Sequence, residues 1–165
     1  MKNMIKAIMA VDDEGGVSKN GSMPWPKNTN DLKWFKKNTL NNVVIMGRLT
    51  WIDPFMPSPL KDRINVLITS KEKNIYPGAD EYVSGNLIDN IKLLSNKYNK
   101  KNIFIIGGPM ILDQLFELID EFFLTRIKGK FSCDKKIDLN KIEKKMKLIK
   151  KIEEDNTCHF EIWRR

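Results

Sequence analysis

The feature of this sequence that most limits its fold is a series of short, almost continuously apolar runs. Residues 43–47 read VVIMG, and residues 103–108 read IFIIGG. Runs of this length without polar alternation are typical of strands that are buried on both faces of a sheet. The six runs that we expect to form strands are residues 5–11, 43–47, 64–69, 103–108, 121–127 and 158–163.

Segments with helical periodicity separate several of these runs. Apolar residues recur every three or four positions in residues 86–98 and 109–119, and Pro109 suits the first position of a helix. Strands that alternate with helices predict a mostly parallel sheet whose faces are covered by helices. The last two apolar runs have no strong helical segment between them, so we expect them to form an antiparallel pair.

Length and composition restrict the class of protein. A chain of 165 residues suits a single domain, and no apolar run reaches the roughly 18 to 20 residues that a membrane span needs. We therefore expect a cytoplasmic protein with no membrane partner. Cys133, Cys158 and the single His159 are too few and too scattered for a zinc motif, so we expect no metal site.

The charge of the chain raises the question of a nucleic-acid partner. The formal net charge is +8, and the densest group of lysines lies in residues 135–154. Glutamates interrupt that group, and no aromatic residue is interleaved for base stacking. We interpret the lysines as a solvated face and expect no nucleic-acid partner.

Residues 23–39, MPWPKNTNDLKWFKKNT, contain the first candidate for chemistry. Asn30 is a suitable N-cap for a helix that continues to Thr39, and Asp31 and Phe35 share one face of that helix. One interpretation is that Asp31 only complements the positive end of the helix. The other is that a desolvated carboxylate with a raised pKa faces a ligand with paired N–H donors. The residues alone leave both interpretations open.

Two strands end in glycine immediately before a helix is expected. Gly47 is followed by Arg48 and Thr50, and Gly107-Gly108 lead directly to the second helix. Backbone N–H groups at such places bind anions readily, although the same pattern also occurs in ordinary tight turns. Neither G-x-G-x-x-G nor the P-loop pattern is present.

Three polar residues flank the strand at residues 64–69. Arg63 precedes it, and Ser70 and Lys71 follow it. The planar guanidinium of Arg63 suits a carboxylate, and Ser70 with Lys71 suits a phosphate at the carboxyl end of a strand. The alternative is that all three are ordinary exposed residues at the ends of an element.

Seven segments, taken in order, resemble the corresponding segments of dihydrofolate reductase. They are IMAVDDEGGVSKNGSMPW, NDLKWFKKNT, VIMGRLTW, SPLKDRINVLITS, IFIIGGPMI, FFLTRI and CHFEIWRR. The resemblance implies a single α/β domain over residues 1–165, with an eight-stranded, mostly parallel sheet, an antiparallel C-terminal strand and about four flanking helices. It also implies a monomer that reduces 7,8-dihydrofolate to tetrahydrofolate with NADPH as cofactor.

The resemblance further implies roles for individual residues. Asp31 would orient the pterin ring, Thr125 would hydrogen-bond Asp31, and a water admitted near Met23 would protonate N5. Arg63 would hold the α-carboxylate of the glutamate tail. The substrate-binding residues would be Ile8, Ala10, Asp31, Leu32, Phe35, Phe55, Leu60, Arg63, Ile106 and Thr125.

The cofactor site follows from the same resemblance. Arg48 with Ser70 and Lys71 favours NADPH over NADH, because a bare ribose hydroxyl needs no such positive charge. Residues 13–23 would form a mobile loop that closes over the nicotinamide. The cofactor-binding residues would be Ala10, Val17, Gly47, Arg48, Leu49, Thr50, Thr69, Ser70, Lys71, Gly107, Gly108, Pro109, Met110 and Ile111.

Four residues depart from the family pattern. Ser18 and Asp62 stand where glycine is usual, Leu49 stands where a basic residue is frequent, and Leu112 stands where a tyrosine often contacts the nicotinamide. Two alternatives therefore remain beside the expected activity. One is another NADPH reductase of the same fold, such as the pyrimidine reductase of riboflavin synthesis, and the other is a catalytically weak homologue that binds folate or NADPH.

Overall fold

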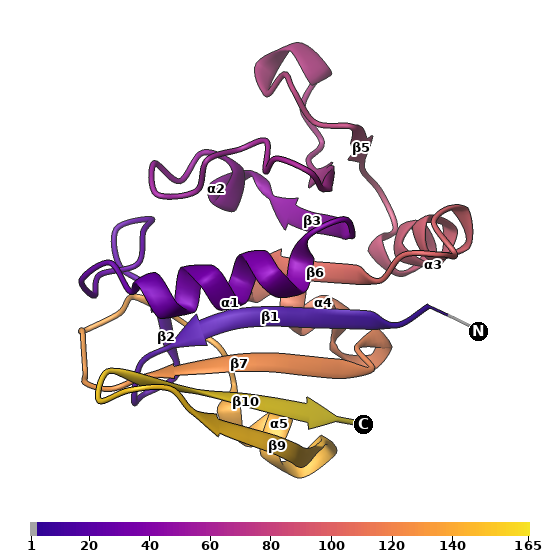
Figure 1. Cartoon of the computed structure of the whole chain (residues 1–165). Coiled ribbons are helices and arrows are strands. Elements are labelled where there is room, and N and C mark those ends of the chain that lie inside the picture. The colour runs from indigo at the N-terminus through magenta and orange to yellow at the C-terminus, as the bar shows by residue number, and fades with distance from the viewer. Residues whose placement is uncertain (1–2) are drawn as a thin grey trace.

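The computed structural model describes residues 3–165 and is built around one eight-stranded sheet (Figure 1). Six neighbouring strands run parallel, and the last two complete the sheet in antiparallel pairs. In spatial order the strands are β5 (Glu81–Val83), β4 (Ile64–Ile68), β3 (Val43–Gly47), β6 (Ile103–Gly107), β1 (Ile5–Val11), β7 (Glu121–Ile127), β10 (Cys158–Arg164) and β9 (Lys147–Glu153).

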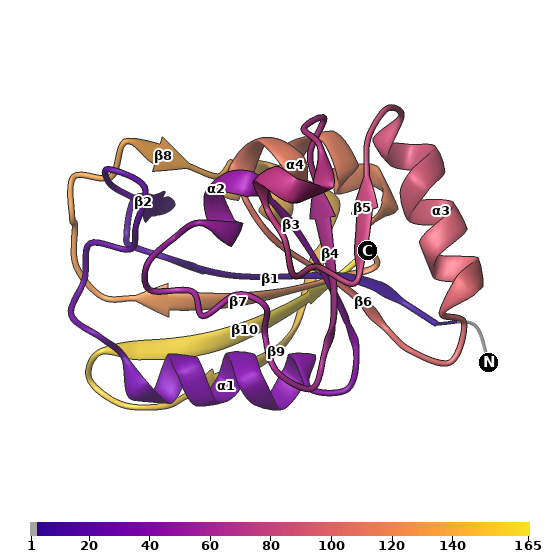
Figure 2. The same ribbon diagram turned by 90° about the horizontal axis from the view of Figure 1, so that it is seen from above.

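Helices cover both faces of this sheet. Figure 2 shows α1 on one side and α3 and α4 on the other. The side chains of α1 pack with Ile8, Phe104 and Phe123, whereas the second face is covered through residues such as Ile91 and Leu115. The helices are α1 (Thr29–Thr39), α2 (Arg48–Trp51), α3 (Leu87–Lys97), α4 (Pro109–Leu115) and α5 (Leu139–Lys145), with 3-10 turns η1 (Lys73–Ile75) and η2 (Phe116–Leu118).

The central strands are buried on both sides, as their composition predicts. Every residue of β3 and β6 is buried. Full burial of a Val, Leu or Ile side chain contributes about 1.5 to 3 kcal/mol, so these two strands supply much of the free energy that opposes unfolding. All six expected strands are present, and β7 and β10 form the expected antiparallel pair.

The structure corrects the expected helices. There are five α-helices in the described residues instead of about four, because α5 lies between β7 and β10. Its seven residues bury only Ile142, so the sequence carries almost no periodic signal, and Asp138 caps it by accepting from the Lys141 N–H. The expected helix over residues 109–119 ends at Leu115 and continues as the 3-10 turn η2.

Four strands of the described residues lie outside the expected set. β9 reads KLIKKIE and is almost wholly exposed at one edge of the sheet, and β5 has three residues at the other edge. The lysines of β9 discourage pairing with another chain at that edge. A separate two-stranded sheet joins β2 (Gly16–Ser18) to β8 (Lys135–Lys136).

Candidate active site

The N-terminal end of α1 places Asp31 against the sheet. The N-cap is Asn28, whose Oδ1 accepts a hydrogen bond from the Asp31 N–H at 3.0 Å. The expectation that Asn30 caps the helix is therefore wrong. Asn30 instead donates from Nδ2 to Asp155 Oδ2 at 2.6 Å, since it already lies inside the first turn.

Asp31 is a buried carboxylic acid without a cationic partner. Its side chain is among the buried polar groups, and no lysine or arginine forms an ion pair with it in the described part of the chain. Burial raises the pKa of the Asp31 carboxyl, and the Thr125 hydroxyl opposes part of that rise. The structure therefore agrees with the interpretation of Asp31 as a desolvated acid.

Polar groups near Asp31 keep unused hydrogen-bonding capacity. Thr125 on β7 is 1% exposed, and its hydroxyl makes no hydrogen bond of standard geometry to a described residue. The Nε1 atom of Trp34, one turn along α1, is also buried without a partner there. Because an unsatisfied buried polar group costs about 1 to 3 kcal/mol, these atoms point to a place for a ligand or water.

The expected apolar wall is brought together only in part. Ile8, Leu60 and Ile106 belong to one buried cluster, and Phe35 packs against it from α1. Phe55 is 68% exposed and lies outside that cluster, and Leu32 is also exposed. Ala10 and Met23 pack instead on the neighbouring cluster around Trp25, Ile127, Cys158 and Phe160.

Arg63 lies at the opposite end of α1 from Asp31. Its Nη1 donates to Thr39 Oγ1 at 3.0 Å, and its guanidinium lies 6.0 Å from the centre of the Phe35 ring. Desolvation lowers the pKa of Arg63, and the nearby Asp62 charge opposes that change. Asp31 and Thr39 are eight positions apart, about 12 Å along the helix axis. The acid and the guanidinium therefore mark the two ends of one extended site.

Asn65 is a buried residue beside the candidate site that the sequence analysis missed. Its Oδ1 accepts from the Leu60 N–H at 2.8 Å, and its Nδ2 donates to the carbonyls of Leu60 and Arg63 at 2.9 and 3.1 Å. At 1% exposure it fixes the turn that carries both predicted substrate residues. The available signal was a lone amide inside the apolar run INVLIT.

Two glycine-initiated helices begin beside each other at the carboxyl edge of the sheet. Gly47 and Gly108 are the N-caps of α2 and α4, and neither supplies a side-chain cap. A Cβ on Gly47 would lie 2.7 Å from Ile111 Cδ1, and one on Gly107 would lie 2.9 Å from Thr50 Oγ1. A Cβ on Gly108 would meet nothing within 4 Å, so this surface is open to a ligand.

Positive charge and exposed side chains border these helix starts. Arg48 opens α2, and Ser70 and Lys71 follow β4, the strand next to β3. The Thr69 hydroxyl accepts from the Lys71 N–H at 3.1 Å. Uncapped amides with cations beside them fit the pyrophosphate and the additional phosphate of NADPH. Met110 and Leu49 are exposed, and Pro109 occupies the first turn of α4.

The segment after β1 is held by one carboxylate. Asp12 accepts from the N–H groups of Gly16 at 2.8 Å and Phe131 at 3.1 Å. Burial raises the pKa of the Asp12 carboxyl. The backbone N–H groups that donate to it lower that pKa by more, so the net effect is a lowered pKa. Val17 is buried in the cluster of the face opposite α1. Ser18 pairs with β8 in ordinary strand conformation, so glycine is not required there.

Two other departures have a structural explanation. Asp62 has a φ of 61°, in the left-handed region where glycine is usual and aspartate is tolerated. Leu112 is 3% exposed and packs in the core beneath α4, so its side chain contributes to folding.

Within residues 3–165 no group of three or more His, Cys, Asp or Glu side chains is placed to hold a metal ion. None of the described helices has the length and apolarity to cross a membrane.

The arrangement defines a class of protein. A mostly parallel sheet that carries a buried acid beside a glycine-lined, positively charged edge is typical of an α/β oxidoreductase that uses a phosphorylated dinucleotide. A sequence profile described as dihydrofolate reductase matches residues 4–165. The chain belongs to the dihydrofolate reductase family.

Individual relatives agree with this assignment. The viral dihydrofolate reductase of Saimiriine herpesvirus 2 (strain 488) is 35% identical over 145 residues, which cover 79% of this chain and 67% of the relative. Dihydrofolate reductase type 9 of Escherichia coli is 32% identical over 169 residues and 96% of this chain, and 92% of its own length is covered.

A solved structure extends the likeness to the fold. The dihydrofolate reductase from Enterococcus faecalis, complexed with NADP(H) and RAB-propyl, superposes with a TM-score of 0.83 at 25% sequence identity. The match covers 100% of this chain and 98% of that one. The expected fold class, an eight-stranded sheet with antiparallel C-terminal strands, is confirmed.

Proposed function

We propose that this chain reduces 7,8-dihydrofolate to 5,6,7,8-tetrahydrofolate with NADPH. The observation that carries this proposal is the placement of an unpaired buried acid, Asp31, and a guanidinium, Arg63, at the two ends of α1. A molecule with a polar ring at one end and a carboxylate tail at the other matches that spacing. The family membership supports the same substrate.

Asp31 is the residue that we assign to the pterin ring. Its carboxylate accepts hydrogen bonds from N3–H and the 2-amino group, which orients the ring and favours the tautomer that can be protonated. The Thr125 hydroxyl, which lowers the pKa of Asp31, supports the carboxylate at this position. Ile8, Phe35 and Ile106 exclude water from the ring.

Proton delivery requires a second group, because the carboxylate is engaged with the opposite side of the ring. We assign this step to a water admitted beside Met23, which protonates N5 and makes C6 a better hydride acceptor. When bound, NADPH supplies the hydride from nicotinamide C4. General acid catalysis of this kind contributes about a hundred- to ten-thousandfold.

The cofactor assignment uses the glycine-lined edge. Backbone amides at the starts of α2 and α4 bind the pyrophosphate, and Arg48 with Ser70 and Lys71 binds the 2′-phosphate. The absence of a Cβ at Gly108 leaves room for the cofactor. At the tail end, Arg63 binds the substrate α-carboxylate, and Leu60 packs against the aminobenzoyl group.

Organisation and location are part of the proposal. We assign residues 1–165 to a single domain that acts as a cytoplasmic monomer, on the basis of the family resemblance. Sedimentation of the purified protein at working concentration tests the monomer, and a dimer mass would contradict it.

The test of function is the loss of NADPH absorbance with dihydrofolate as substrate. We expect robust turnover that falls as pH rises, because N5 of the substrate has to be protonated for hydride transfer. Turnover of a ribosylated pyrimidine without turnover of dihydrofolate would indicate the alternative reductase. Binding of both ligands without turnover would indicate a weak homologue.

A further inference from the structure

The turn between β9 and β10 reaches the helix that carries Asp31. Asn28 Nδ2 donates to Thr157 Oγ1 at 3.0 Å, and Thr157 Oγ1 donates to Asp155 Oδ1 at 2.6 Å. Asn28 also accepts the Asp31 N–H on its Oδ1. A continuous series of hydrogen bonds therefore runs from Asp155 in the turn to the backbone of the buried acid.

The direction of each hydrogen bond in this series is fixed from both ends, by the Asp155 carboxylate, which only accepts, and by the Asp31 N–H, which only donates. An ionised carboxylate only accepts, so the single Thr157 hydroxyl proton points toward it. The Thr157 oxygen is then left as an acceptor, and it selects the NH₂ side of the Asn28 amide. That choice agrees with the orientation an N-cap needs, in which Asn28 Oδ1 accepts the Asp31 N–H, and the Cys158 thiol donates to the same oxygen at 3.8 Å.

Asp155 is suited to hold this direction over a wide pH range. Hydrogen bonds from the side chain and backbone of Thr157 and from Asn30 lower the pKa of Asp155 to about 2. The Cys158 N–H also donates to Asp155 at 3.1 Å. The carboxylate is therefore ionised at neutral pH.

We propose that Asp155 and Thr157 are positioning residues that act through Asn28 to hold Asp31 in its buried position at the start of α1. This inference rests on the proposed function. Without the cap, the first-turn N–H groups and water become available to the Asp31 carboxylate, and both favour its charged form. The turn thus sets the pH range of the reaction without touching substrate.

The surroundings of the turn make the proposal testable by substitution. Asp155 and Thr157 are exposed, so a change there removes no core packing. A cavity of about 460 Å³ adjoins the series, with Lys27 and Lys128 as the cations on its rim. On the β10 side the nearest titratable neighbour is the Cys158 thiol, whose pKa is raised by burial and by the charges of Asp155 and Asp31.

The first measurement is the pKa of the Asp31 carboxyl by carbon NMR in the parent protein, in Thr157→Val and in Thr157→Ser. Loss of a cap is expected to lower that pKa by about 0.5 to 1 unit in Thr157→Val, whereas Thr157→Ser keeps the hydroxyl and the parent value. Asp155→Asn, which no longer fixes the proton direction, is expected to shift it in the same sense as Thr157→Val. This measurement needs no turnover, so it stands even if the proposed reaction fails.

The second measurement is the rate of hydride transfer against pH. We expect the midpoint of the Thr157→Val profile to move to lower pH, with a rate about fivefold lower at neutral pH. The matched control is Asn86→Ala, because Asn86 caps α3 by accepting the Asp89 N–H at 3.0 Å and lies on a helix without site residues. It should lower the melting temperature alone.

Two results would overturn the proposal. One is an Asp31 pKa and a pH profile in Thr157→Val and Asp155→Asn that match the parent while the melting temperature falls as in Asn86→Ala. The other is an equal shift in Thr157→Ser, since the hydroxyl would then not be the group that matters.

Discussion

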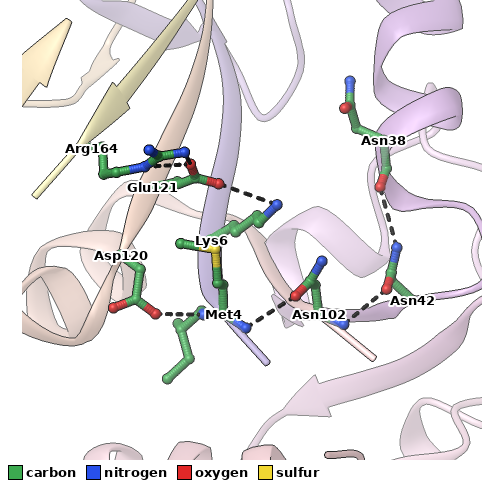
Figure 3. A network of polar contacts seen from close by, with 9 residues as sticks. Met4, Lys6, Asn38, Asn42, Asn102, Asp120, Glu121 and Arg164 are labelled. Atoms are coloured by element: carbon green, nitrogen blue, oxygen red, sulfur yellow. Dashed lines mark hydrogen bonds and ion pairs between the residues drawn. The ribbon is translucent and has the colours of Figure 1, made fainter. Parts of the chain in front are cut away.

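Asp31 and Glu121 are both buried acids on the α1 side of the same sheet, but they differ in the charges around them. Glu121 lies between Lys6, with Nζ at 3.2 Å, and Arg164, with Nε at 2.8 Å (Figure 3). Asp31 has no lysine or arginine paired with it among the described residues, and the neutral hydroxyl of Thr125 is the side-chain group that lowers its pKa. The charge of Glu121 is therefore balanced within the fold, whereas Asp31 has no cationic partner among the described residues and is left for a ligand with N–H donors.

The two positions are close in the fold, which makes the difference informative. Every second residue of β7 faces the same side of the sheet, and Glu121, Phe123 and Thr125 are three such residues. At about 3.3 Å per residue, Glu121 lies about 13 Å from Thr125 along the strand. The Lys6 ammonium also lies 5.1 Å from the centre of the Phe123 ring. At the Glu121 end of β7 the Lys6 cation stabilises the fold. At the Thr125 end the lack of a cation leaves Asp31 free to bind a ligand.

The substitution with the largest expected effect on the difference between Asp31 and Glu121 is Asp31→Asn, which keeps the side-chain shape but cannot ionise. We expect the rate of hydride transfer at neutral pH to fall by at least ~100-fold. Single-turnover kinetics with saturating NADPH measure it. A loss smaller than tenfold would show that the acid is not central to the reaction.

The reciprocal change is Glu121→Gln. It leaves Lys6, which is largely buried, without its charge partner, and we expect the free energy of unfolding to fall by about 1 to 3 kcal/mol. Urea unfolding measures this, and kcat should stay at the parent value. Glu117→Gln is the control, because Glu117 pairs with Arg165 at 3.6 Å while 75% exposed, and it should change stability by less than about 0.5 kcal/mol.

Asn65 gives an intermediate case, a buried polar group without charge. In Asn65→Asp the amide donors to Leu60 and Arg63 are lost, so the turn that positions the Arg63 guanidinium loosens. We expect KM for dihydrofolate to rise about tenfold with kcat nearly unchanged, and no change for a dihydropterin that lacks the tail. Equal effects on both substrates would contradict the assignment of Arg63 to the tail.

The smallest expected effect is on the pH dependence of stability. Burial raises the Asp31 pKa in the folded state above 3.8, so the folded protein binds this proton more tightly than the unfolded chain does. Asp31 therefore lowers the free energy of unfolding as pH rises from 3.8 through the folded-state pKa. Asp31→Asn should be more stable than the parent above that range and should converge with it at low pH, as urea unfolding across pH would measure.

The sequence predicted the parts of the fold that local composition determines. The buried strands β3 and β6 are apolar throughout, and Asp31 with Phe35 on one helix face was enough to mark a candidate site. The residues that it missed depend on distant partners. Asn28 and Asn30 have equal capping propensity, and the contacts of Asn28 with Thr157 and of Asn30 with Asp155 distinguish them.

The same reason explains the missed elements. β9 is a strand because β10 pairs with it, although its lysine-rich sequence has no strand pattern of its own. Asn65 is likewise polar within an apolar run, and its purpose is visible only when the turn from Leu60 to Arg63 folds back on it. The individual roles of the cofactor and substrate residues remain predictions that the experiments above address.

The position of β1 in the middle of the sheet has a consequence for synthesis on the ribosome. Ile5 pairs with Ile103 of β6, and Ala10 pairs with Thr125 of β7, so both neighbours of β1 are translated late. At about 5 to 20 residues per second, the emerging chain carries this apolar strand without partners for about 5 seconds or longer. Each new molecule therefore passes through an interval in which β1 is exposed to aggregation before its own sheet can cover it.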